Sequence, residues 1–127
     1  MGRDNLILAA DFNGVIHDHQ GKAGFCEAGS PEIPGAITWL KEISETYDVF
    51  LVSASFSKAP FVVAARAWLE AKGVPRPWLT PVPVGRSRIT LTPFKPACVM
   101  FIDDRGFQFV GTFPTLEAIQ AFKPWNR

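Results

Sequence analysis

The chain of 127 residues has few cysteines, almost no net charge and no long apolar segment, and each of these features excludes a class of protein. Its two cysteines, Cys26 and Cys98, have neither C-x-x-C spacing nor a companion group of histidines, which argues against a zinc site or a thioredoxin-like centre. A formal net charge of +1 lacks the basic excess of a strong nucleic-acid binder. No stretch approaches the roughly 20 apolar residues that span a bilayer.

The beginning of the sequence also lacks the pattern of a secretory signal peptide, because its first apolar run covers only residues 6–10 and ends at Asp11. We therefore expect a cytoplasmic protein that does not associate with membranes. Hydrophobic residues make up 47% of the chain and charged residues 20%, which is ordinary for a globular protein. The length predicts a single domain over residues 1–127.

Three short apolar runs each end at a polar or acidic residue. The runs are residues 6–10, 49–52 and 99–102, and the residues that follow them are Asp11, Ser53 and the pair Asp103-Asp104. Such runs are typical of buried parallel strands, whose carboxyl ends form the edge of the sheet where open α/β folds bind ligands. We therefore expect these polar side chains to share one edge.

The remaining periodicity predicts an α/β fold, Rossmann-like, with three layers and a mainly parallel sheet. The expected elements are strands at 6–10, 47–53, 88–92 and 97–102, and helices at 35–45, 59–72 and 115–122. Residues 14–34 are expected to form a long loop at the active edge. Expected core residues are Cys98, Trp39, Trp68, Leu116, Ile119, Phe107, Phe109, Phe113 and Phe122.

The polar residues at this edge match the needs of phosphoryl transfer. Asp11 can attack a phosphomonoester, and Asp11 with Asp103 offers the few carboxylate ligands that suit Mg²⁺. Ser53 can donate a hydrogen bond to a phosphoryl oxygen, and Lys95 can offset the negative charge of Asp11 and phosphate. Ser55 and Ser57 lie near Ser53 in the sequence, so the hydroxyl that contacts phosphate stays open between Ser53 and Ser55.

The order of these residues resembles the haloacid dehalogenase superfamily. Residues 7–15, Ile-Leu-Ala-Ala-Asp-Phe-Asn-Gly-Val, are similar to its first motif, a strand ending in D-x-D-G-[TV]. Ser53 resembles the second motif, Lys95 the third and residues 101–104 the acidic fourth. The tail further resembles small uncharacterised members of the superfamily, many of them from bacteriophages, in Lys95-Pro96, Ile102-Asp103-Asp104-Arg105, Phe113-Pro114-Thr115 and Pro124-Trp125.

The resemblance implies a Rossmann-like fold, Mg²⁺ as cofactor and an aspartyl-phosphate intermediate on Asp11. It assigns catalytic roles to Asp11, Asn13, Ser53 and Lys95, substrate binding to Gly14, Ser53, Ala54 and Lys95, and metal binding to Asp11, Asn13, Asp103 and Asp104. In this assignment Asn13 contributes its backbone carbonyl to the metal. Asp104 has two alternatives, capping the following turn or orienting Lys95.

Too few residues separate the motifs for the cap domain that many members carry, so the chain resembles a capless member. A capless site is open, which suits a phosphorylated small molecule or a polynucleotide end, or a lid from another subunit of a homo-oligomer. Residues 14–29 would then correspond to the family's squiggle and flap. His17, His19 and Phe25 could contact substrate there, or they are solvated or packed loop residues.

Asn13 departs from the family, whose hydrolases have at this position a second Asp that acts as general acid and base. An amide cannot exchange that proton, and such transfer contributes about 10² to 10⁴ in rate. Either the sequence is an engineered Asp-to-Asn variant of an active enzyme, which we favour, or the chain is naturally a phospholigand-binding module. A receiver domain is disfavoured, because receivers have the acidic pair after the first strand and a Lys after the last.

Overall fold

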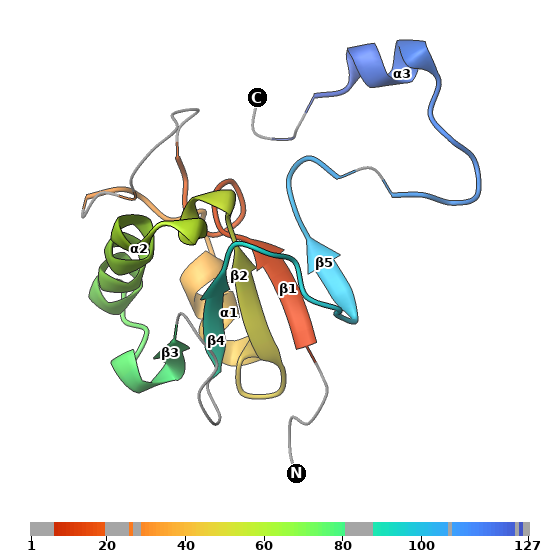
Figure 1. Ribbon diagram of the computed structural model, residues 1–127. Coiled ribbons are helices and arrows are strands. Elements are labelled where there is room, and N and C mark those ends of the chain that lie inside the picture. Colours follow the sequence, from red (N-terminus) through yellow and green to blue (C-terminus); the bar gives the residue numbers. More distant parts are fainter. Residues whose placement is uncertain are drawn as a thin grey trace.

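The computed structural model describes residues 7–19, 26, 29–80, 88–106, 108–123 and 125, and it has an α/β fold. One sheet has the strand order β3-β4-β2-β1-β5, and every pairing in it is parallel. The strands are β1 (Ile7–Asp11), β2 (Asp48–Val52), β3 (Leu79–Thr80), β4 (Ile89–Thr92) and β5 (Met100–Ile102). The carboxyl ends of all these strands therefore lie at one edge, the upper edge in Figure 1. The predicted α/β class and parallel sheet are confirmed.

Helices follow β1 and β2, as the sequence predicted, with ends that differ by one or two residues. The helices are α1 (Ala36–Ile43), α2 (Ala59–Ala71) and, near the C-terminus, α3 (Leu116–Ala121), with the 3₁₀ turns η1 (Ala54–Ser57) and η2 (Arg76–Trp78). Gly35 precedes α1 with a φ of 85°, a left-handed conformation that glycine adopts without steric cost. Pro60 lies in the first turn of α2, where a missing N–H costs no hydrogen bond.

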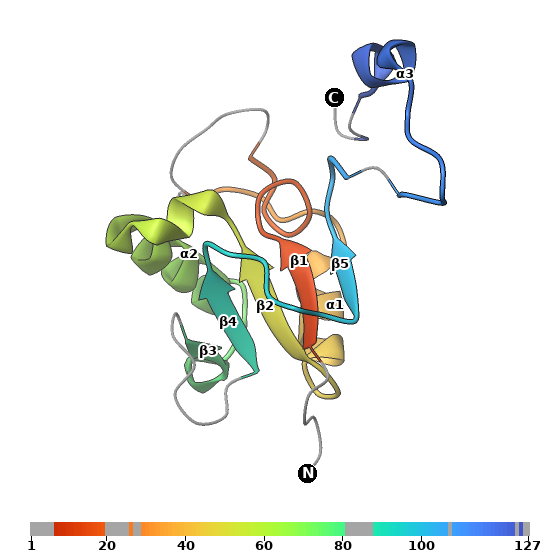
Figure 2. The same ribbon diagram turned by 45° about the vertical axis from the view of Figure 1, so that its right-hand side comes forward.

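Both α1 and α2 cover the same face of the sheet. Ala10, Leu51 and Leu91 point to one face by register, and they form a single core with the buried sides of the two helices. The helical members of that core are Ala36, Ile37, Leu40, Ala65, Trp68 and Leu69. In Figure 1 α1 lies behind the sheet and α2 at its left side, and in Figure 2 both helices lie on the far side of the strands.

The opposite face carries no helix among the described residues, which differs from the expected three layers. Instead, residues 93–99 cross in front of β2 and β1 on the way to β5 (Figures 1 and 2). The Lys95 Nζ lies 5.8 Å from the centre of the Phe101 ring on this face. Pro93 and Pro96 explain the absence of a helix in this segment, because proline lacks an N–H donor and disfavours a helical residue before it.

The C-terminal arm, residues 108–123, leaves the sheet after β5 and projects away from it (Figures 1 and 2). The prediction that its apolar residues join the core is wrong. Their exposed fractions run from 44% to 80% for Phe109, Phe113, Leu116, Ile119 and Phe122, whereas Phe107 lies outside the described residues. Cys98 also differs from expectation, because β5 begins only at Met100 and Cys98 is half-buried.

The expected burial of Trp68 is confirmed, and Trp39 is buried in part. Trp68 is 1% exposed and Trp39 is partly buried against the core. Among the described residues, no helix is both long and apolar enough to cross a membrane.

Candidate active site

β1 is the central strand of the site, because β2 and β5 pair with it on its two sides. Asp11 ends β1, opposite Val52 of β2, and Ala10 pairs with Ile102 of β5. Ser53 follows Val52 directly and the acidic pair follows Ile102 directly. The register therefore brings the motif residues at the ends of these three strands to one edge, as the sequence predicted.

Asp11 and Asp104 form the closest acidic pair at this edge. Burial and a hydrogen bond with the Asp104 carboxyl raise the pKa of Asp11 from 3.8 to about 7, and the negative charges of Asp104 and Asp103 add to this effect. Arg105 partly offsets the increase. The Asp104 side chain is only 3% exposed. Two carboxyl groups in this arrangement share a proton at neutral pH, or they need a cation in its place.

Asp103 has a different local role from Asp104. Its Oδ1 accepts hydrogen bonds from the backbone N–H groups of Arg105, at 2.8 Å, and Gly106. A Cβ at position 106 would lie 2.8 Å from both Asp103 carboxylate oxygens, so a side chain there would displace the Asp103 carboxylate. Asp103 thus caps the turn after β5, a role that the sequence analysis offered for Asp104, while Asp104 lies against the nucleophile candidate.

Asn13 and Gly14 begin a tight turn that directly follows β1. The backbone N–H of Gly14 donates to the His17 carbonyl at 2.8 Å, and the N–H of His17 donates to the Phe12 carbonyl at 2.8 Å. Gly14 has a φ of 92°, which L side chains rarely adopt. This turn holds Asn13 beside the end of β1.

His17 fixes the orientation of the Asn13 amide. Its Nδ1 lies 2.7 Å from Asn13 Oδ1. Burial lowers the pKa of His17, so the ring is neutral and its Nδ1–H donates to the amide oxygen. The amide nitrogen of Asn13 consequently faces away from His17 and is available as a donor.

The His17 ring itself belongs to the core, so it is packed rather than solvated. It is 2% exposed, stacks on Phe12 at 5.3 Å between ring centres, and contacts the edge of Trp68 at 5.2 Å. Trp68 Nε1 in turn donates to the Ser30 carbonyl at 2.8 Å, which fastens the loop before α1 to α2. The spacing of four residues between Asn13 and His17 was the only sequence signal for this contact.

Ser53 and Ser55 approach Asn13 from β2. Together with Asn13 they line a cavity of about 10 Å³, roughly the space of one water molecule. Ser53 also caps η1, because its Oγ accepts from the backbone N–H of Ser55 at 3.3 Å. Both serines therefore stay candidates for the phosphate contact, and Ala54 lies exposed between them.

Cys26 lines the same cavity. Burial raises the pKa of its thiol to about 12, so it is a neutral packing residue rather than a nucleophile.

Two cations, Lys95 and Arg105, follow β4 and β5 respectively, and they differ in their contacts. Lys95 is exposed and contacts the Phe101 ring. Arg105 has its Nε 4.0 Å from Asp104 Oδ2 and lowers the pKa of Asp11. Its position directly after the Asp-Asp pair was the available signal.

The donor set of this edge fits Mg²⁺ better than a transition metal. Its ligand candidates are carboxylate and carbonyl oxygens, and Mg²⁺ usually takes one or two carboxylates and keeps several waters. Within the described part of the chain, no three or more His, Cys, Asp or Glu side chains, Asp11, Asp103 and Asp104 included, are grouped so that they could hold a metal ion. The Asp11–Asp104 pair is the feature that a divalent cation would stabilise.

Comparisons of the chain with protein-family models, with curated proteins and with solved structures find no match.

Proposed function

We propose that the chain is a capless, Rossmann-like member of the haloacid dehalogenase superfamily and a Mg²⁺-dependent phosphohydrolase that is weakened by Asn13. It would act on a phosphomonoester through an aspartyl-phosphate at Asp11. The observation that carries the proposal is the Asp11–Asp104 pair at the end of the central strand, with the pKa of Asp11 raised to about 7. Such a perturbed carboxyl at the ligand-binding edge of a parallel sheet is a candidate for catalysis or cation binding.

The residues divide the work of phosphoryl transfer among them. An oxygen of ionised Asp11 attacks phosphorus, the bond from phosphorus to the ester oxygen breaks, and the phosphoryl group is transferred to Asp11. Ser53 or Ser55 donates a hydrogen bond to a phosphoryl oxygen, and Lys95 offsets its charge. Water then attacks the aspartyl-phosphate and releases inorganic phosphate.

Mg²⁺ would be held by Asp11, by the acidic pair and by the backbone carbonyl of Asn13. It would neutralise the charge of the nucleophile and the phosphoryl oxygens. The raised pKa of Asp11 supports this assignment, because a cation at the site would replace the proton that Asp11 and Asp104 otherwise share.

The proton carrier is the weak element of this mechanism. The leaving alkoxide needs a proton, and the attacking water must lose one, but the Asn13 amide can do neither. His17 is not a substitute, because burial lowers its pKa and its Nδ1 is occupied by Asn13. We therefore expect slow hydrolysis with Asn13 and efficient hydrolysis with Asp at this position.

The open form of the site favours substrates that extend beyond it. α1 is the one helix described between Asp11 and Ser53, and the described residues between Ser53 and Lys95 hold η1, α2, η2 and two strands of the sheet. A phosphorylated small molecule or a polynucleotide end would fit a site without a cap.

A second candidate function is a phospholigand-binding module without catalysis. The contact from His17 Nδ1 to Asn13 Oδ1 favours it, because this contact leaves the amide N–H groups of Asn13 available to a phosphate oxygen. A binding role would need no proton transfer at this position.

The experiment that separates the two functions is the change Asn13→Asp. Wild type, Asn13→Asp and Asn13→Ala are tested with Mg²⁺ on nucleotides, sugar phosphates and oligonucleotides phosphorylated at either end. We expect Asn13→Asp to raise hydrolysis by about two or more orders of magnitude, and Asn13→Ala to raise nothing. Asp11→Asn in the Asn13→Asp background should abolish the gain. No gain on any substrate would reject the hydrolase and leave the binding module.

A further inference from the structure

The C-terminal arm carries an apolar surface that its own chain leaves uncovered. Six of its side chains are large, apolar and exposed, and they are Phe109, Val110, Phe113, Leu116, Ile119 and Phe122. Leu116 and Ile119 are three residues apart in α3 and so lie on one side of it. Because α3 has only six residues, it is too short to be stable alone and needs a surface against which to pack.

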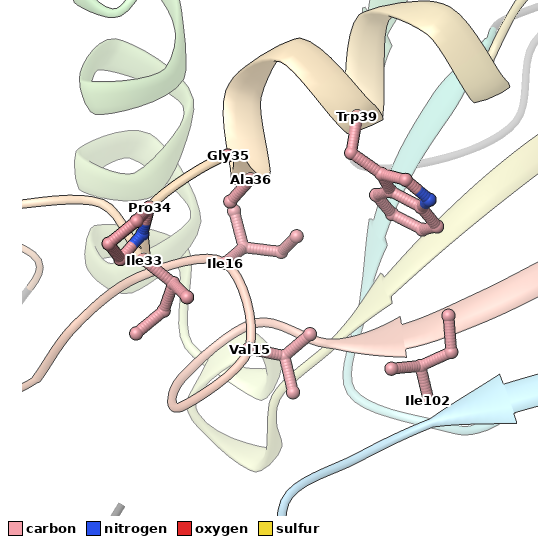
Figure 3. A pocket seen from close by; sticks show the side chains of 8 residues that line it. All are labelled: Val15, Ile16, Ile33, Pro34, Gly35, Ala36, Trp39 and Ile102. Carbon is pink, nitrogen blue, oxygen red and sulfur yellow. The ribbon is translucent and has the colours of Figure 1, made fainter.

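The body of the molecule has an apolar groove between α1 and β5. Its volume is about 290 Å³, and its lining includes Val15, Ile33, Trp39 and Ile102 but no charged side chain. Figure 3 shows these four side chains around a common space, contributed by the loop after β1, the loop before α1, α1 and β5. An apolar cavity of about 150 Å³ accepts a benzene molecule, so this groove has room for about two aliphatic or aromatic side chains.

The groove continues along an exposed sheet edge. β5 is the last strand on its side of the sheet and has only three residues. Met100, which has the same parity as Ile102 and so faces the side of α1, is 59% exposed. The apolar surface therefore extends from the groove along β5, which gives a helix such as α3 a longer surface to contact.

The direction of the arm indicates that the missing cover is a second molecule. In both views the arm points away from its own α1 and β5 (Figures 1 and 2).

We propose that the C-terminal arm of one copy binds in the groove between α1 and β5 of a second copy, and that the exchange is reciprocal. Each copy supplies one arm and one groove, so the contact closes with two-fold symmetry and makes a dimer. Val15 links the groove to the tight turn that begins at Asn13. The partner's arm would therefore border the candidate active site and supply a rim that the single chain lacks.

The first test is the mass of the protein in solution, measured by light scattering and analytical ultracentrifugation. We expect a dimer for the wild type and a monomer for Leu116→Asp and for Ile119→Asp. Ala121→Asp adds the same charge on the opposite side of α3 and should stay dimeric. A monomeric wild type, or a dimer that neither substitution dissociates, would overturn the proposal.

The second test identifies the groove and the chain that fills it. Gln120→Cys lies beside Leu116 on α3, and Pro34→Cys lies at the rim of the groove, both in a Cys98→Ser background. When the two single variants are mixed and oxidised in air, we expect a disulfide-linked heterodimer. Ser57→Cys, exposed and outside the groove, should give none with Gln120→Cys.

A chain that carries both Gln120→Cys and Pro34→Cys gives the decisive contrast. A disulfide between chains supports the exchange, whereas a disulfide only within one chain means that the arm folds back on its own body, which would overturn it. Absence of any cross-link in both formats would also reject this groove as the binding site.

Discussion

The body and the C-terminal arm have similar apolar patterns but opposite environments. In the body, Trp68 on α2 is 1% exposed and contacts Phe12 and His17, while in the arm Phe113 is 80% exposed and contacts only Phe109 among the described rings. Spacing of apolar residues indicates that an element will pack, but it does not say against what. Among the described residues, the arm projects away from the sheet and its apolar side chains stay exposed.

The largest effect that would sharpen this comparison is on stability. Trp68→Ala should lower the free energy of unfolding by about 3 to 5 kcal/mol, because it leaves a cavity in the core and removes the hydrogen bond from Trp68 Nε1 to the Ser30 carbonyl. Phe113→Ala in the monomeric Leu116→Asp background should change it by less than about 0.5 kcal/mol. Urea unfolding of the two variants measures the difference. Comparable losses would mean that the arm packs against its own body.

A second prediction compares a cation of the body with one of the arm. In the Asn13→Asp background, Lys95→Ala should lower kcat/KM by about 10² to 10³, because Lys95 would stabilise charge on the transferred phosphoryl group. Its melting temperature should change little, since Lys95 is exposed. Lys123→Ala, the matched change in the arm, should leave turnover intact. Near-normal turnover of Lys95→Ala would transfer this role to Arg105.

A third prediction concerns the pH dependence of stability without Mg²⁺. The pKa of Asp11 is about 7 in the folded protein, whereas its ordinary value of 3.8 applies in the unfolded chain. The folded state therefore binds the proton of Asp11 more tightly than the unfolded state does. The contribution of Asp11 protonation to the stability of the folded state is present at low pH and is lost as the pH rises from about 4 through 7. Thermal unfolding should show the decline in wild type and in Glu45→Gln, but not in Asp11→Asn.

Mg²⁺ provides the complementary check of that pH dependence. At pH 8, millimolar Mg²⁺ should raise the melting temperature of wild type and not that of Asp11→Asn, because the ion binds the folded state alone. An unchanged wild-type melting curve would contradict the binding of Mg²⁺ at Asp11.

Much of the fold could be predicted from sequence, because short apolar runs and helical spacing report burial directly. Residues 7–11, 48–52 and 89–92 are strands for that reason, and both main helices end close to their predicted bounds. The number of layers could not be predicted in this way. It depends on residues 93–99, which contain two prolines and cross the second face of the sheet as an extended segment.

At the site, sequence predicted which residues reach the edge but not how they pair there. Parallel strands bring Asp11, Ser53 and the acidic pair to the same edge by topology alone. Whether Asp103 or Asp104 contacts Asp11 depends on the turn at Gly106. The backbone N–H groups of this turn donate to the Asp103 carboxylate, and the Asp104 carboxyl contacts Asp11. The contact of His17 with Asn13 similarly depends on the turn at Gly14.

The central claim, that Asp11 is a phosphorylated nucleophile, is tested most directly by intact-mass spectrometry of the protein with Asn13 retained. A phosphomonoester with a good leaving group needs little acid assistance, so it should phosphorylate Asp11 slowly, and the intermediate should persist because Asn13 cannot activate water. After incubation with Mg²⁺ and such a substrate, we predict the mass of one added phosphoryl group, located at Asp11 by peptide mapping and absent in Asp11→Asn. An unmodified mass under these conditions, or a phosphoryl group that persists in Asp11→Asn, would contradict the account.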